Sequence, residues 1–267
     1  MAGDELNDKV KAWIQSQGFP LEMQVANAFL KTGFRAVQAD YYTDPDTGTS
    51  REIDVVASKQ SVYGKQVIRL NIVVECKVSK DKPWILLTSP QAKLHPRAQV
   101  AQQAASRSGR KLLSLAAKLE AYQQLPLFRF PERPAYGVLQ AFSSGNDIAY
   151  AACMSAAKAA ASLTSEEDTQ GEIAFAEIVI PAVVIDGRIF DCHLDESGEL
   201  STEEVEDGML VWRNPIVGMP HTMIRLISLP FLGRFVERVK QAANMILDSE
   251  KDGMAKLLST DANHTKG

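Results

Sequence analysis

Cysteine is scarce in this 267-residue chain, and its three cysteines stand far apart. Cys76, Cys153 and Cys192 form no C-x-x-C pair, so the sequence indicates neither a disulfide framework nor a zinc ribbon. Long apolar runs are missing too: the most apolar stretch, residues 175–185, includes Glu177 and falls short of the ~18 residues that a membrane-spanning helix needs. The N-terminus is acidic and polar, unlike a signal peptide. We therefore expect a cytoplasmic protein without a membrane segment.

The net charge of the whole chain is only −4, but the charges are unevenly distributed. Residues 59–118 hold twelve Lys/Arg and two acidic residues, whereas residues 164–212 hold fourteen Asp/Glu and one Arg. This asymmetry is typical of a basic binding face beside an acidic, solvated region. Two oppositely charged faces that only keep the protein soluble explain it equally well. Charge alone leaves both interpretations open.

Composition and length indicate a globular protein with a sizeable core. Hydrophobic residues make up 45% and charged residues 23% of the chain, which excludes collagens, coiled coils and disordered chains. A chain of this size buries about 70–75% of its unfolded surface. We expect residues 1–163 to form the core with an N-terminal helix, residues 164–247 to form an acidic β-rich extension packed on it, and residues 248–267 to be a polar tail.

The hydrophobic pattern predicts helices first and then a run of strands. Residues 4–17 and 20–32 carry apolar side chains at helical spacing. Asp186-Gly187 is typical of a two-residue hairpin turn, and Gly109 is expected to break a helix. The strands and further helices are predicted at 34–42, 52–58, 67–78, 136–142, 172–185, 188–194, 209–213 and 224–228, and at 97–106, 110–122, 146–162 and 230–247.

Two of these strands carry residues that suggest chemistry. Asp54 lies within an apolar strand, where a carboxylate is costly unless it is paired or bound to a metal. Glu75 and Lys77 share one face of another strand, because side chains alternate between faces. If the two strands are neighbours, Asp54 and Glu75 can converge on one hard divalent cation. That cation would polarise a phosphoryl oxygen and acidify a bound water, and Lys77 would orient the water or stabilise the developing charge.

The same residues have a purely structural explanation. Glu75 and Lys77 can form an ion pair at a strand end, and Asp54 can be a hydrogen-bonded buried carboxylate. A Glu-x-Lys pattern occurs by chance about once in a chain of this length. The order of three elements strengthens the functional interpretation. A helix with Glu22, a strand with Asp54 and the strand with Glu-x-Lys follow one another within about 60 residues.

In this order, the segments GFPLEMQVANAFLKTGF, SREIDVVAS and LNIVVECKVS resemble the PD-(D/E)xK nuclease superfamily, which has the restriction-endonuclease-like fold. The resemblance implies an α/β core of order α-β-β-β-α-β, with a mixed central sheet flanked by helices. Here a C-terminal β-rich extension that ends in a helix would follow it. The resemblance assigns Mg²⁺ or Mn²⁺ to Asp54 and Glu75, and to Glu22 through water. It implies four catalytic residues: Glu22, Asp54, Glu75 and Lys77.

The function that the resemblance implies is a Mg²⁺-dependent phosphodiesterase, an endonuclease acting on nucleic acid, with DNA the expected substrate, in defence or repair. The alternative is a non-catalytic nucleic-acid-binding or scaffold protein of the same fold. Ile53 stands where the family motif has Pro, which loosens the match. No sequence-reading motif is evident, so we expect a partner protein to provide any specificity. A homodimer is the other expected assembly, because many nucleases of this fold cut both strands as dimers. The candidate phosphate contacts are Lys59, Lys65, Lys80, Lys82, Arg97, Arg107, Arg110 and Lys111.

Three further features of the sequence give weaker signals. Asp44-x-Asp46-x-Gly48 resembles the start of a calcium loop, but Val55 stands where that loop needs Glu, so we predict a hairpin turn. Cys76 is predicted to be a small core residue on the far face of its strand. The family resemblance also suggests that a polar helix residue supports the site, with three candidates: Gln99, Gln102 and Gln103.

Overall fold

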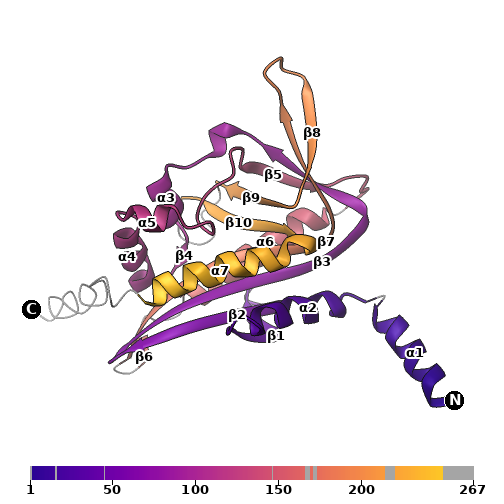
Figure 1. The fold of residues 1–267 in the computed structure, drawn as a ribbon, viewed down its shortest axis with the longest axis horizontal. Helices are drawn as coiled ribbons and strands as arrows, with labels where there is room; N and C mark the ends of the chain where they lie inside the picture. Colours follow the sequence, from indigo (N-terminus) through magenta and orange to yellow (C-terminus); the bar gives the residue numbers. More distant parts are fainter. Residues whose placement is uncertain are drawn as a thin grey trace, which may run out of the picture.

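The computed structural model describes residues 2–15, 17–44, 46–145, 147–165, 169–170, 173–213 and 220–248. These residues form a mixed α/β protein in which helices cover one ten-stranded sheet (Figure 1). The predicted polar tail after residue 248 lies outside the described residues. Within the described part, no helix is long and apolar enough to cross a membrane.

Groups of helices and groups of strands follow one another along the described residues. The helices are α1 (Ala2–Gln15), α2 (Phe19–Leu30), η1 (Pro90–Ala92), α3 (Pro96–Ala101), α4 (Arg107–Ala116), α5 (Glu120–Gln123), α6 (Ile148–Ser165), η2 (Leu229–Phe231) and α7 (Leu232–Leu247). The strands are β1 (Arg35–Thr43), β2 (Ser50–Tyr63), β3 (Gln66–Thr88), β4 (Ala104–Ala105), β5 (Ala135–Gln140), β6 (Thr169–Gln170), β7 (Ile173–Leu194), β8 (Leu200–Val205), β9 (Asp207–Trp212) and β10 (Thr222–Ser228).

Two long strands, β3 and β7, form the centre of the sheet. They run parallel, from the pair Gln66↔Ala174 to the pair Leu87↔Cys192. β2 and β1 extend the sheet beyond β3 as antiparallel neighbours, while β5, β9 and β10 lead from β3 back to β7 and close a ring. Residues 173–194, which the sequence analysis assigns to an extension, therefore lie in the same sheet as the strands before residue 163.

The prediction of a hairpin at Asp186-Gly187 is wrong. β7 continues through both residues, and Gly187 is the register partner of Ser79 on β3. A Cβ atom at Gly187 would lie 2.4 Å from the carbonyl oxygen of Ser79. This glycine therefore permits two neighbouring strands to approach closely, which is the other common use of glycine within a strand.

The predicted helix break at Gly109 is wrong for the same physical reason. Gly109 lies inside α4, and a Cβ atom there would come within 2.2 Å of the carbonyl oxygen of Glu177 on β7. The missing side chain lets α4 lie directly against the sheet. The chain is instead interrupted earlier, where β4 separates α3 from α4 and pairs with β7.

The core is divided by the sheet into layers. α2 and α7 pack on one face, around Phe29, Phe235 and Val239, and α6 packs on the other (Figure 1). α6 is rich in alanine, so its backbone lies close to the strands, as its small side chains predict. The predicted helix near the N-terminus forms as α1, but its apolar residue Trp13 is 61% exposed.

Candidate active site

β2 and β3 separate next to the predicted site. Their antiparallel pairing extends only to Val55↔Val74, one residue short of Asp54 and Glu75. The pairing of β1 with β2 also lapses at Asp54, opposite Ala39, which has a positive φ of 52°. Irregularities of this kind redirect side chains at a sheet. The carboxylate of Asp54 is free to turn across β3, where its Oδ2 accepts a hydrogen bond from the backbone N–H of Cys76 at 2.7 Å.

Lys77 joins the two carboxylates that the sequence pattern singles out. Its Nζ lies 2.9 Å from Oε2 of Glu75 and 3.6 Å from Oδ2 of Asp54. Burial lowers the pKa of Lys77, but the negative charges of Glu75 and Asp54 outweigh burial and raise it above its ordinary value. Lys77 is therefore protonated near neutral pH. The structure brings these three residues together at the point where the strands diverge.

Glu22 adds a third carboxylate from the first turn of α2. Its pKa is raised, first by burial and then by the negative charge of Asp54, whereas Lys77 acts in the opposite direction. Glu22 thus lies within the electrostatic reach of the other site residues. The resulting cluster has three carboxylates and one ammonium group, an excess of negative charge in a half-buried position.

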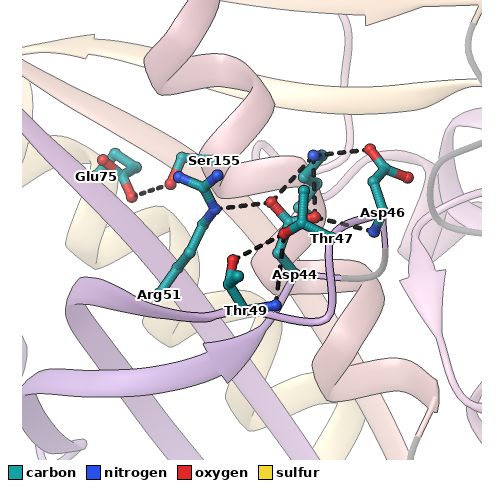
Figure 2. Close-up of polar contacts among 8 residues, drawn as sticks. Asp44, Asp46, Thr47, Thr49, Arg51, Glu75 and Ser155 are labelled. Carbon is teal, nitrogen blue, oxygen red and sulfur yellow. Dashed lines mark hydrogen bonds and ion pairs between the residues drawn. The ribbon is translucent and has the colours of Figure 1, made fainter.

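Ser155 on α6 is a site residue that the sequence analysis missed. Its hydroxyl donates a hydrogen bond to Oε1 of Glu75 at 2.6 Å (Figure 2). The other oxygen of the nearly buried Glu75 carboxylate faces Lys77, so both oxygens are held. The buried hydroxyl of Tyr42 lies beside Ser155, and burial raises its pKa. The available signal was a serine interrupting an otherwise alanine-rich helix.

One turn further along α6, Lys158 fixes the tip of the β1–β2 hairpin. Its Nζ lies 3.1 Å from Oδ1 of Asp44, whose other oxygen receives a hydrogen bond from Nε of Arg51 at 2.7 Å (Figure 2). Asp44 also accepts a hydrogen bond from the backbone N–H of Asp46. This backbone bond and the two cations lower the pKa of Asp44 to about 2. The predicted hairpin turn is confirmed, since the N–H of Gly48 donates to the carbonyl of Asp44.

The donor set of the cluster fits a hard divalent cation. Carboxylate oxygens are the ligands that Mg²⁺ prefers, and Asp54 and Glu75 each present one to the same ammonium group. Among the residues that the structure describes, no group of three His, Cys, Asp or Glu is already arranged to hold a metal ion. The ammonium group of Lys77 lies within ion-pair distance of both Asp54 and Glu75. A cation bound to both carboxylates would require this ammonium group to move aside.

The sequence analysis predicted that Cys76, which lies between Glu75 and Lys77 in the chain, is a core residue. Cys76 packs against the core formed with α2 and α7, and burial raises the pKa of its thiol, as suits a core residue.

The three glutamines contact other parts of the protein. Gln99 accepts a hydrogen bond from the N–H of Phe130, Gln103 accepts one from Arg225, and Gln102 lies 3.0 Å from His221. The suggestion that one of them supports Glu75 is not borne out by these contacts.

Part of the charge asymmetry in the sequence is balanced within the sheet, by two ion pairs between β3 and β7. Because β3 and β7 are parallel, the basic segment runs beside the acidic one. Arg69 lies 2.9 Å from Glu177, its register partner, and Lys80 lies 3.2 Å from Asp186. The opposite charges of the two segments therefore serve partly to pair the two central strands.

The candidate phosphate contacts are distributed over several elements. Lys65 lies in the turn before β3 and Lys80 lies in the second half of β3, which places them on the order of 45 Å apart along the strand. Lys59 donates a hydrogen bond to Asn244 on α7. Arg97 lies on α3, and three residues lie on α4: Arg107, Arg110 and Lys111. Lys80 and Lys82 lie on the same strand as Lys77, three and five residues after it.

In comparisons with known proteins, no protein-family model, no curated protein and no solved structure matches this chain.

Proposed function

We propose that this protein is a metal-dependent nuclease that hydrolyses phosphodiester bonds in nucleic acid, with DNA as the expected substrate. One observation carries the proposal: the ammonium group of Lys77 lies within ion-pair distance of the carboxylates of Asp54 and Glu75, and Glu22, on a third element, lies within electrostatic reach of them. The order α2, β1, β2, β3 agrees with the start of a restriction-endonuclease-like core, and we propose that fold for the region around the site.

The charge balance of the cluster supports a bound cation. Like charges close together disfavour one another, and one ammonium group cannot compensate three carboxylates. Asp54 and Glu75 would hold Mg²⁺ or Mn²⁺ directly, and Glu22 would contribute through water. When bound, the ion would polarise a phosphoryl oxygen and acidify a water molecule.

Each side chain of the site then has a distinct task. Lys77 keeps its proton, because the neighbouring carboxylates raise its pKa, so it can stabilise negative charge that develops on the phosphoryl group. Ser155 holds Glu75 in one orientation through the hydrogen bond to Oε1. The hydrogen bond from the backbone of Cys76 does the same for Asp54. Lys80 and Lys82 continue along β3 and would contact the phosphates of the substrate backbone.

The test is a cleavage assay on the full chain. Single-stranded, duplex and branched DNA, together with RNA, are incubated with the protein in Mg²⁺, in Mn²⁺ and in EDTA. We expect cleavage of at least one substrate in Mg²⁺ or Mn²⁺ and none in EDTA. Lys77→Ala should abolish cleavage, whereas Lys240→Ala, which removes a lysine of α7 that pairs only locally with Glu237, should leave it unchanged.

Two results would contradict the proposal. Cleavage that persists in Lys77→Ala would mean that the assigned site does not perform the reaction. Binding of nucleic acid without cleavage in either metal would instead support a non-catalytic nucleic-acid-binding protein of the same fold.

A further inference from the structure

A buried arginine lies on the other side of β7 from the candidate active site. Arg225 is in the middle of β10, with only 5% of its surface exposed. Its Nη1 donates to Oε1 of Gln103 at 3.0 Å, and its Nη2 donates to the carbonyl oxygen of Leu127 at 2.9 Å. Its Nε has no hydrogen-bond partner among the described residues. All of the partners named for its guanidinium group are neutral.

The positive charge of Arg225 is therefore not compensated by an acid in the described part of the chain. Burial lowers the pKa of Arg225 to about 9, which still leaves the guanidinium group charged near neutral pH. A buried charge without a partner of opposite sign is strongly unfavourable. Proteins retain such a group where it serves a purpose, and binding an anion is the simplest one.

The surroundings of Arg225 agree with an anion site. Arg225 lines a cavity of about 310 Å³ together with two other arginines, Arg129 and Arg238. One carboxylate, that of Asp207, also lines it and lies 2.8 Å from Arg238. The cavity therefore has an excess of two positive charges among its lining residues. Phe130 and Phe235 contribute an apolar wall.

We propose that this cavity binds a small molecule that carries a phosphate monoester, such as a mononucleotide. A phosphate monoester has a charge close to −2 near neutral pH, which matches the excess charge of the lining. Guanidinium groups recognise phosphate oxygens in pairs, through parallel N–H donors. The cavity volume is at the lower limit of small-ligand sites, which favours a compact ligand over a polymer. The apolar wall would contact the organic part of the molecule.

This site is separate from the candidate active site. β7 lies between β10 and β3, since Ala182 is the register partner of both Arg225 and Val74. None of Glu22, Asp54, Glu75 and Lys77 lines the cavity. The proposal therefore does not depend on nuclease activity.

The test is a binding titration of the full chain with three probes: adenosine monophosphate, inorganic phosphate and adenosine. Calorimetry and thermal melting are performed at constant ionic strength, set with sodium chloride and in the absence of divalent metals. We expect the monophosphate to bind saturably and to raise Tm, inorganic phosphate to bind more weakly, and adenosine to have no effect.

Variants locate the binding without disturbing the buried arginine, whose replacement risks unfolding. Arg129→Ala and Arg238→Ala should each weaken binding of the monophosphate by about tenfold or more, the effect of losing a hydrogen bond to a charged group. Arg234→Ala is the matched control, because Arg234 is an exposed arginine of α7 that pairs with Glu206.

Three results would overturn the proposal. The first is no saturable binding of any probe. The second is equal affinity of the wild type, Arg129→Ala and Arg238→Ala for the monophosphate. The third is equal affinity for the monophosphate and for inorganic phosphate, which would assign the cavity to the free ion and reject the organic ligand.

Discussion

Two charged clusters contact α6 one turn apart, through Ser155 and Lys158, and they differ in charge balance. At the hairpin tip, the carboxylate of Asp44 is surrounded by Lys158, Arg51 and a backbone N–H, so its charge is fully compensated. At the strand divergence, Ser155 contacts Glu75 within a group of three carboxylates that has one ammonium group. The first arrangement stabilises the fold by itself. The second has an excess of negative charge, which is the basis of the cation site that we propose there.

Replacing Lys77 in one cluster and Lys158 in the other should give the largest difference between the two clusters. Lys77→Ala removes the cation that pairs with Asp54 and Glu75 among the described residues, and we expect cleavage to fall by at least about 10²–10³-fold, the usual effect of losing one oriented charge at such a site. Its Tm should fall in EDTA and recover in Mg²⁺, because a bound cation replaces the lost positive charge.

Lys158→Ala is the counterpart at the hairpin tip. It should lower Tm equally in EDTA and in Mg²⁺ and leave kcat of the folded protein within about twofold of the wild type. The same response of both variants to Mg²⁺ would mean that the two clusters do not differ in the way we infer.

Ser155→Ala should have an intermediate effect. Without the hydroxyl, Glu75 loses the hydrogen bond that fixes Oε1, and we expect kcat to fall by about tenfold, equivalent to about 1.4 kcal/mol. KM should be nearly unchanged, because Ser155 acts through Glu75 and does not contact the substrate. Ser155→Thr retains the hydroxyl and should restore activity. A Ser155→Thr variant as impaired as Ser155→Ala would indicate a packing effect instead.

The smallest expected effect is on the acid stability of the hairpin cluster. The pKa of Asp44 is lowered from 3.8 to about 2, so its ionised form contributes stability above its unfolded pKa, and this stability is lost as pH falls toward 2. Asp44→Asn should therefore be less stable than the wild type at neutral pH. As the pH falls from 3.8 to about 2, the variant should lose less stability than the wild type does. Urea unfolding at a series of pH values measures the free energy of unfolding of both proteins. Parallel pH profiles of the two proteins would contradict the assignment.

Local patterns predicted most of the elements and three residues of the candidate site, Asp54, Glu75 and Lys77, because both depend on short-range sequence. The alternation of side chains placed Glu75 and Lys77 on one face, and the apolar run around Asp54 predicted its strand. The structure brings all three together. Ser155 was missed because its contact with Glu75 joins residues far apart in the chain, and a serine in an alanine-rich helix does not reveal its partner.

The errors in the fold have a similar origin. Asp186-Gly187 has the composition of a turn, but Gly187 pairs with Ser79, more than a hundred residues earlier, and the strand continues through both residues. The sequence analysis placed the opposite charges of the two long segments in separate regions, whereas Arg69 and Glu177 face each other across neighbouring strands. In both cases, long-range pairing decides the outcome, and a single sequence does not contain that pairing.

The central inference is that the surplus carboxylates at the strand divergence bind a divalent cation. A calorimetric titration of Mn²⁺ into the wild type, Asp54→Asn and Asp44→Asn tests it directly, because each variant removes one carboxylate charge from one cluster. We predict one Mn²⁺ site in the wild type and in Asp44→Asn, and an affinity at least about 100-fold lower in Asp54→Asn, since losing a ligand costs more than losing a residue that only supports one. Equal Mn²⁺ affinity in the wild type and Asp54→Asn, or no Mn²⁺ binding in the wild type, would contradict it.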